Sequence, residues 1–307
     1  MNEPTTTTRN VEEHRVHTEI TGDMSSVDIM KVSGLDFIAQ QTPIMTTNGL
    51  DINTHKALFR SDNQAILGVV GKNYEPIQNH ELFAFTDILA KEYDAKYAHA
   101  YALNDGRRVA IQLEINGGME IKNDDRVMKY ITVTGSHDGS GSVRAYATAY
   151  RLWCSNQLNI GYRNRHREYT ISLRHTTNVR ERFKEAQAIF NLSIDAFSQF
   201  EVQAKQLAEK VVDGNMVDKF LTEILGEPIK ADGASSVRIQ NKRDEVTHLF
   251  QHGKGNDGKT AWDLLNGLTE FIDHGTNTNN ENKQYNSAMF GHGQDIKAKA
   301  FETALAL

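Results

Sequence analysis

Arginines gather in one segment of a chain that is acidic overall. From Arg144 to Lys184 there are nine basic residues, opposed only by Glu168 and Glu181. This segment therefore carries +7, and because the 307-residue chain has a formal net charge of −6, the remainder carries −13. The planar guanidinium of arginine donates paired hydrogen bonds to phosphate, so we expect local binding of a polyanion. The predicted phosphate contacts are Arg144, Arg151, Arg163, Arg165, Arg167, Arg174 and Arg180.

Aromatic residues interleave with these arginines. We predict that Tyr146, Tyr150 and Tyr162 are stacking platforms, because every nucleic-acid base has a flat face on which an aromatic ring can stack. Rings beside cationic side chains are typical of proteins that bind single-stranded nucleic acid. The alternative is a solvated segment whose arginines pair with the acidic remainder of the chain, and the sequence leaves both interpretations open.

Residues 143–153 are predicted to form a β-strand, in which successive side chains point to opposite faces. One face then carries Arg144, Tyr146, Thr148 and Tyr150. The other face carries Ala145, Ala147, Ala149 and Arg151. Arg151 thus falls among small residues, where a buried guanidinium would need a partner.

Two histidines and one aspartate form one possible centre for enzymatic chemistry. His137 and Asp138 form the His-Asp pair that metal phosphohydrolases use, and His175 is a candidate third ligand. The pair lies, however, in a stretch rich in glycine and serine, which forms turns for steric reasons alone.

Two further patterns could carry chemistry. Gly253–Thr260 matches G-x-x-x-x-G-K-S/T, but a phosphate-binding loop follows a buried strand, and the preceding residues 243–252 read as a polar helix. A glycine-rich connection between two helices explains the same letters. Cys154 is the only cysteine, which excludes an intramolecular disulfide, and a lone cysteine after an apolar strand is usually a small buried residue.

The first half of the chain is predicted to be rich in strands. Apolar runs at 56–60 and 66–70 flank a polar turn and predict a hairpin, and a helix is expected from Asn79, as its N-cap, to Tyr93. A second hairpin is expected around Asn104–Gly106. Further strands are predicted at 127–134, 143–153 and 169–173.

The second half reads as helical. A long amphipathic helix is expected over 178–212, and shorter ones over 215–225, 235–251, 260–273 and 295–306, with an Asn-rich loop at 277–286. Strands followed by helices define an α+β protein, with an antiparallel sheet and helices in the N-terminal half and a helical C-terminal half. The expected divisions are a disordered tail at 1–34, an α+β domain at 35–212 and a helical region at 213–307.

Cellular location is predicted from what the sequence lacks. No window of about 18 apolar residues could span a membrane, and the polar N-terminal residues do not resemble a secretory signal. We therefore expect a protein of the host bacterial cytoplasm, with no membrane partner.

Several segments in a fixed order resemble phage/plasmid-like proteins that are grouped as a bacterial domain of unknown function. The segments are Leu67–Asn79 (LGVVGKNYEPIQN), Val133–Ser140 (VTGSHDGS), Trp153–Asn156 (WCSN), Leu173–Thr176 (LRHT) and Thr260–His274 (TAWDLLNGLTEFIDH). The resemblance covers roughly residues 50–305 and implies an origin in phages, prophages or plasmids. It carries no catalytic residues with it.

The order of the predicted elements is also similar to the core of single-strand annealing recombination proteins. In that family a hairpin, a helix, several antiparallel strands and a long helix build rings or filaments that hold DNA in a basic groove. None of their sequence motifs is present, so this is an analogy of fold order.

We therefore expect a non-enzymatic, phage-type protein that binds single-stranded DNA, promotes strand annealing in replication or recombination, and assembles as a homo-oligomeric ring or filament without cofactor or metal. A metal-dependent nuclease or phosphohydrolase using His137, Asp138 and His175 is the first alternative. A structural phage protein that binds a partner through its C-terminal helices is the second.

Overall fold

The computed structural model describes residues 16–122, 124–152, 156–160, 170–173, 175, 195–228, 236–275 and 280–307. Within these ranges two antiparallel sheets precede a series of helices, which confirms the predicted α+β class. None of the helices in the described ranges has both the length and the apolar character needed to cross a lipid bilayer.

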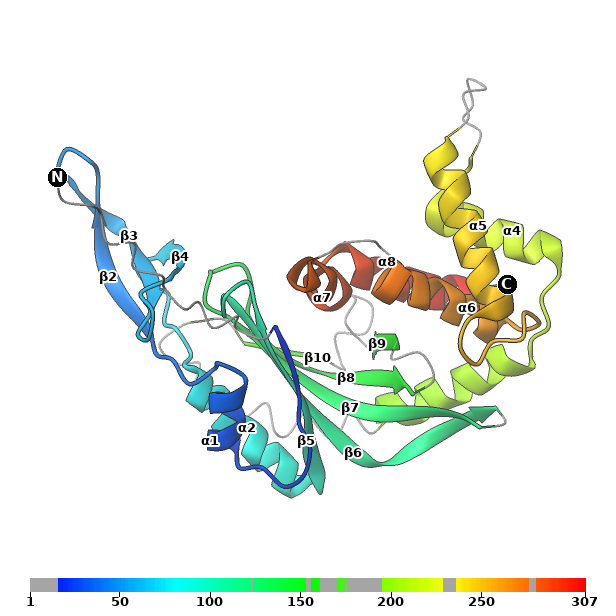
Figure 1. Cartoon of the computed structure of the whole chain (residues 1–307), viewed down its shortest axis with the longest axis horizontal. Helices are drawn as coiled ribbons and strands as arrows, with labels where there is room; N and C mark the ends of the chain where they lie inside the picture. Colours follow the sequence, from blue (N-terminus) through cyan, green and yellow to red (C-terminus); the bar gives the residue numbers. More distant parts are fainter. Residues whose placement is uncertain are drawn as a thin grey trace, which may run out of the picture.

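The larger sheet forms the centre of the molecule (Figure 1). Among the described residues it has seven antiparallel strands in the order β1-β5-β6-β7-β8-β10, and β9 also pairs with β8. The strands are β1 (His17–Glu19), β5 (Ala95–Leu103), β6 (Arg108–Lys122), β7 (Asp125–Ser136), β8 (Val143–Arg151), β9 (Asn156–Ile160) and β10 (Thr170–Leu173).

The turn between β5 and β6 is the predicted hairpin turn. Asn104, Asp105 and Gly106 all have positive φ, at 51°, 60° and 84°. Asparagine, aspartate and glycine adopt this left-handed region more readily than other residues, so the local sequence fixes where the chain reverses.

A smaller sheet of three strands extends away from the larger one (Figure 1). It contains β2 (Ala39–Met45), β3 (Asp51–Arg60) and β4 (Ile66–Gly71), and the predicted hairpin corresponds to β3 and β4. Arg60, buried at the end of β3, pairs with Asp62 in the turn and lies 4.0 Å above the ring of Phe37.

Helices α1 (Ser26–Val32) and α2 (Asn79–Glu92) lie on one side of the larger sheet (Figure 1). Leu82, Phe83 and Leu89 of α2 pack against Ile111 and Val133 of the sheet in the first hydrophobic cluster. The α2 helix differs from the prediction at its start, where Gln78 rather than Asn79 is the N-cap. The backbone N–H of Gln78 donates to the carboxylate of Glu81, and the Asn79 side chain makes tertiary hydrogen bonds instead.

Part of the N-terminal segment that was predicted as a disordered tail is folded. Within 1–34, β1 pairs with β5 and lies at one edge of the described part of the larger sheet, and Ile29 of α1 is fully buried. Both elements are too short to give a clear period in the sequence, and both depend on tertiary contacts for their stability. Residues 1–15 lie outside the described ranges.

The C-terminal half is helical, as predicted. Residues 195–209 form the described part of the expected long helix. They are followed by α4 (Gly214–Leu225), α5 (Val237–His252), α6 (Ala261–Glu270), a short π-helical segment η2 (Phe271–Gly275), α7 (Glu281–Phe290) and α8 (His292–Leu305). The Asn-rich stretch was predicted to be a loop, but its second part forms α7, which begins with Asn280 as its N-cap.

A second hydrophobic cluster joins the two halves of the chain. Met119 and Val127 of the sheet pack in it together with Phe200, Trp262 and Ala300 of the helices. The predicted division between residues 212 and 213 therefore falls inside one continuous core.

Candidate functional site

Strand β8 carries the predicted binding residues, and its two faces follow the expected alternation. Ala145, Ala147 and Ala149 are buried on one face, and Arg151 is buried there too, with 2% of its surface exposed. Tyr146 on the opposite face is also fully buried, whereas Arg144 and Tyr150 are partly exposed. Burial removes Tyr146 and Arg151 from direct contact with a ligand in this conformation.

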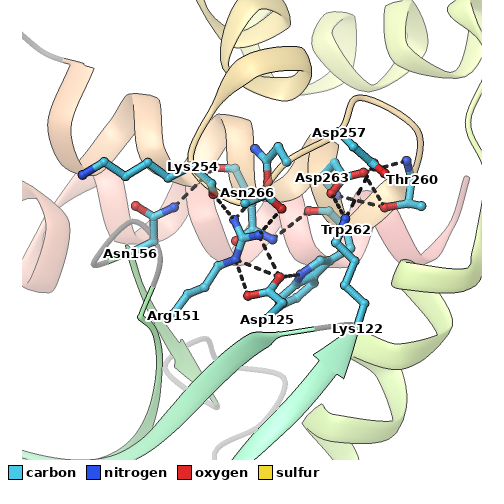
Figure 2. Close-up of polar contacts among 12 residues, drawn as sticks. Lys122, Asp125, Arg151, Asn156, Lys254, Asp257, Thr260, Trp262, Asp263 and Asn266 are labelled. Atoms are coloured by element: carbon cyan, nitrogen blue, oxygen red, sulfur yellow. Dashed lines mark hydrogen bonds and ion pairs between the residues drawn. The ribbon is translucent and has the colours of Figure 1, made fainter.

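The buried guanidinium of Arg151 forms an ion pair, as its burial requires. Its guanidinium donates to both carboxylate oxygens of Asp125 on the neighbouring strand β7, at 2.7 to 3.0 Å. Trp262 at the start of α6 donates its indole N–H to the same carboxylate at 2.8 Å (Figure 2). Asp125 is 1% exposed, so this is a buried and hydrogen-bonded ion pair.

The loop that matches the phosphate-binding pattern encloses the other side of this guanidinium. Arg151 donates to the carbonyl oxygens of Lys254 and Gly255, at 3.1 and 2.8 Å, and to the side-chain oxygen of Asn256 at 3.0 Å. In a nucleotide-binding loop the backbone N–H groups face an anion, but here carbonyl groups face a cation. The loop joins α5 to α6, which confirms the expected connection between helices.

Two further contacts attach α6 to the sheet. Thr260 and Asp263 form a capping box at the start of α6, and Lys122 at the end of β6 pairs with the buried carboxylate of Asp263 (Figure 2). Asn156 of β9 donates to the Thr269 hydroxyl at 3.0 Å. These contacts and the Arg151–Asp125 pair hold the C-terminal helices against the sheet, which is a structural role.

The face of the sheet that carries Arg144 and Tyr150 has a polar interior. Gln112 donates to Thr132, and Thr132 bonds Thr148, which donates to Asn159, so one network crosses β6, β7, β8 and β9. On the same face of β8, the ring of Tyr150 lies 5.1 Å from the ring of Tyr130.

The VTGSHDGS segment ends β7 and continues into a tight turn between β7 and β8. The hydroxyl of Ser136 accepts from the N–H of Gly141 at 3.1 Å, and the N–H of Ser140 donates to Asp138 at 2.8 Å. Tyr74 donates its hydroxyl to the carbonyl of Ser136 at 2.6 Å. Strand β4 packs closely behind the turn, because a Cβ on Gly68 would lie 2.8 Å from the Cα of Asp138.

On its open side this turn lines a pocket of about 100 Å³. Arg108 at the start of β6 and Arg144 of β8 contribute guanidinium groups, and Phe290 at the end of α7 contributes an aromatic ring. The rest of the lining is small and polar: Thr134, Gly135, Ser136, Ser140, Gly141 and Ser142. Two arginines among hydroxyl groups and glycines are the chemistry that binds phosphate.

Arg108 is held in place by residues from both halves of the chain. It donates to the Ser140 hydroxyl at 3.1 Å and to the side-chain oxygen of Asn286 on α7 at 2.7 Å. Its guanidinium also lies 3.7 Å from the Asp138 carboxylate. This carboxylate therefore offsets part of the positive charge of Arg108.

Behind the turn, two buried histidines are held neutral. His137 bonds the side-chain oxygen of Asn79 through Nε2, and His175 bonds the Glu75 carbonyl through Nδ1. Because those oxygens only accept, each of these ring nitrogens carries the proton. Burial, with a smaller contribution from nearby His175, lowers the pKa of His137 to about 4.

The structure brings His137, Asp138 and His175 into one region, since Asp138 acts on the titration of both histidines. In the described part of the chain, however, no three His, Cys, Asp or Glu side chains are arranged to hold a metal ion. The described residues thus supply no ligand set for the phosphohydrolase alternative.

Six of the predicted contact residues lie outside the described ranges. They are Tyr162, Arg163, Arg165, Arg167, Arg174 and Arg180. Of the four described ones, Arg144 lines the pocket, and Tyr150 is partly exposed nearby on the same strand.

Sequence reasoning missed Arg108 and Phe290. A signal for Arg108 was present, because antiparallel pairing of two predicted neighbouring strands places the start of one beside the end of the other, and Arg108 does pair with Ser136. No local pattern points to Phe290.

A comparison of the sequence with known families gave a match. The chain is a member of the family described as a domain of unknown function, DUF932, which matches residues 66–290. This range contains the turn, the pocket and the Arg151–Asp125 pair, and it confirms the predicted membership of a family of unknown function. Comparisons with curated proteins and with solved structures gave no match.

Proposed function

We propose that this protein binds single-stranded DNA through its phosphate backbone, with the pocket beside the β7–β8 turn as one contact point. The observation that carries the proposal is the pairing of Arg108 with Arg144 around a turn of serines and glycines. A phosphodiester is a compact anion with oxygens that accept hydrogen bonds, and this pocket offers it two planar donors and several hydroxyl groups.

The position of the pocket in the sequence supports a larger interface. Arg144 is the first residue of the arginine-rich segment, and it pairs across the sheet with Ser172 of β10. The other candidate arginines that we retain are Arg163, Arg165, Arg167, Arg174 and Arg180, and they follow Arg144 in the same segment. A run of cations tracks a phosphate chain, whereas an isolated pair binds one phosphate.

Binding of a labelled single-stranded oligonucleotide over a range of salt concentrations tests the proposal. For single strands, the logarithm of the affinity falls with the logarithm of salt concentration by about 0.7 per phosphate neutralised. The double variant Arg108→Ala with Arg144→Ala should bind more weakly and have a salt slope shallower by about 1.4. Arg238→Ala is the matched control, because Arg238 is an exposed arginine on α5, outside the pocket.

Other variants separate charge from geometry. Arg144→Lys keeps the charge but loses the paired donors, so it should keep the salt slope and lose part of the affinity. An unchanged affinity and slope in the double variant would rule out the pocket. If changing Arg163, Arg165 and Arg167 together to alanine also had no effect, the DNA-binding proposal would fail as a whole.

Annealing and assembly are further parts of the same proposal. Several copies along one strand would present its bases to a complementary strand, so we expect a homo-oligomeric ring or filament and faster annealing of complementary oligonucleotides. Mass measurement with and without DNA tests the assembly. A fluorescence annealing assay that shows no acceleration would reject this role while leaving DNA binding intact.

A further inference from the structure

Helix α7 supplies one wall of the arginine pocket, and this wall is aromatic. Phe290 is the last residue of α7, and its side chain is only partly buried. The guanidinium of Arg108 lies over its ring, 5.6 Å from the centroid. The pocket therefore joins cationic groups with a partly open ring, although the ring comes from a part of the chain far from the arginine-rich segment.

The ring is held firmly. Met289 beside it is 2% exposed and packs in a small cluster with Tyr101, Leu103 and Ala110 of the sheet, and Phe290 packs against the same cluster. The helix is also tied at its side chains, since Asn282 accepts from the N–H of Asn104 at 2.7 Å and Asn286 accepts from Arg108. A ring fixed before binding loses little conformational entropy when a ligand stacks on it.

We propose that Phe290 is a stacking platform for the nucleobase that adjoins the phosphate bound by Arg108 and Arg144. This inference rests on the proposed function and assigns part of the DNA site to the C-terminal helices. A base can stack on an aromatic side chain when it is free of its neighbours, so the platform favours a single strand over a duplex. The phosphate contacts alone do not make that distinction.

A comparison of normal and abasic strands isolates the stacking. An oligonucleotide with abasic sites keeps its phosphates, so it retains the arginine contacts and loses the bases. The wild-type protein should bind the normal strand more tightly than the abasic strand. Phe290→Leu keeps an apolar side chain but removes the ring, so it should weaken binding of the normal strand about tenfold and shrink the difference between the two strands.

Three further measurements test whether Phe290 acts by stacking. The salt slope of Phe290→Leu should equal that of the wild type, because stacking releases no counterions. Phe290→Tyr keeps an aromatic ring, so it should bind the normal strand about as tightly as the wild type. Phe301→Leu on α8 is the matched control, since Phe301 is also partly buried but packs on Phe200 away from the pocket, and it should leave DNA binding unchanged.

The outcomes separate this inference from the proposed function. If the arginine variants lose affinity and salt slope while Phe290→Leu binds both strands like the wild type, the stacking role is wrong and phosphate binding stands. If Phe290→Leu lowers the salt slope as well, its effect comes from displaced arginines, and the stacking role is again wrong. If neither kind of variant changes binding, both proposals fall.

Discussion

Replacing Arg151 by alanine should destabilise the fold strongly. The substitution removes the hydrogen bonds of the guanidinium to Asp125 and those to the carbonyl groups of Lys254 and Gly255. Asp125 would remain buried, with the indole N–H of Trp262 as a donor but without its opposing charge. The substitution thus lowers the free energy of unfolding in two ways: hydrogen bonds are lost, and a buried carboxylate is left without an opposing charge.

The size of this effect follows from the burial of both partners. Removing one member of a buried ion pair costs about 3–5 kcal/mol, whereas exposed pairs are worth about 0–1 kcal/mol. Folded domains are stable by only about 5–15 kcal/mol, so Arg151→Ala should remove about a fifth or more of the total. Asp125→Asn should have a similar cost, because it leaves the guanidinium buried without its counter-charge.

Urea unfolding followed by circular dichroism measures the change in the free energy of unfolding. Lys205→Ala is the control, because Lys205 pairs with Glu201 on the surface of the helix at 195–209, and its loss should cost under about 1 kcal/mol. The double variant Arg151→Met with Asp125→Leu replaces the pair by apolar side chains and should be more stable than either single variant. A cost for Arg151→Ala no greater than that of Lys205→Ala would refute the assigned structural role.

Two other substitutions test the surroundings of the β7–β8 turn. Gly68→Ala should displace the turn, because the added Cβ would lie 2.8 Å from the Cα of Asp138, and it should weaken oligonucleotide binding through Arg108 and Arg144; unchanged affinity would contradict the close packing described. The pKa of His137 is lowered from 6.5 to about 4 in the folded state, so the unfolded state takes up the proton first as pH falls. Stability should therefore decrease between about pH 6.5 and 4, and His137→Gln should reduce this dependence by about 2 kcal/mol in urea titrations at pH 7 and 4.5; equal dependence in both proteins would disprove it.

Local periodicity was enough to predict the faces of β8. Alternation over residues 143–151 placed Arg151 among alanines, and the need for a partner followed from the cost of burying a charge. The identity of that partner was not predictable, because Asp125 and Lys254 are 26 and 103 residues away from Arg151. Pairing over such separations depends on the assembled sheet and helices.

The pocket, too, could be predicted from the sequence only in part. Arg144 was predicted from the charge of its segment, but Arg108 meets Asn286 across 178 residues, and no short pattern encodes that contact. Helix α7 was overlooked because asparagines favour turns and loops. In the folded protein Asn280 caps that helix, and Asn282 and Asn286 attach it to the sheet. Residues that indicate a loop locally thus serve as docking groups.

The buried pair of Asp125 and Arg151 also has a consequence during protein synthesis. Trp262, which donates to Asp125, follows it by 137 residues. At about 5–20 residues per second, a ribosome needs roughly 7–27 s to add this stretch. During that interval the nascent sheet carries two charged side chains without the loop and indole that later enclose them. The end of β8 should therefore stay open on the ribosome until α6 emerges.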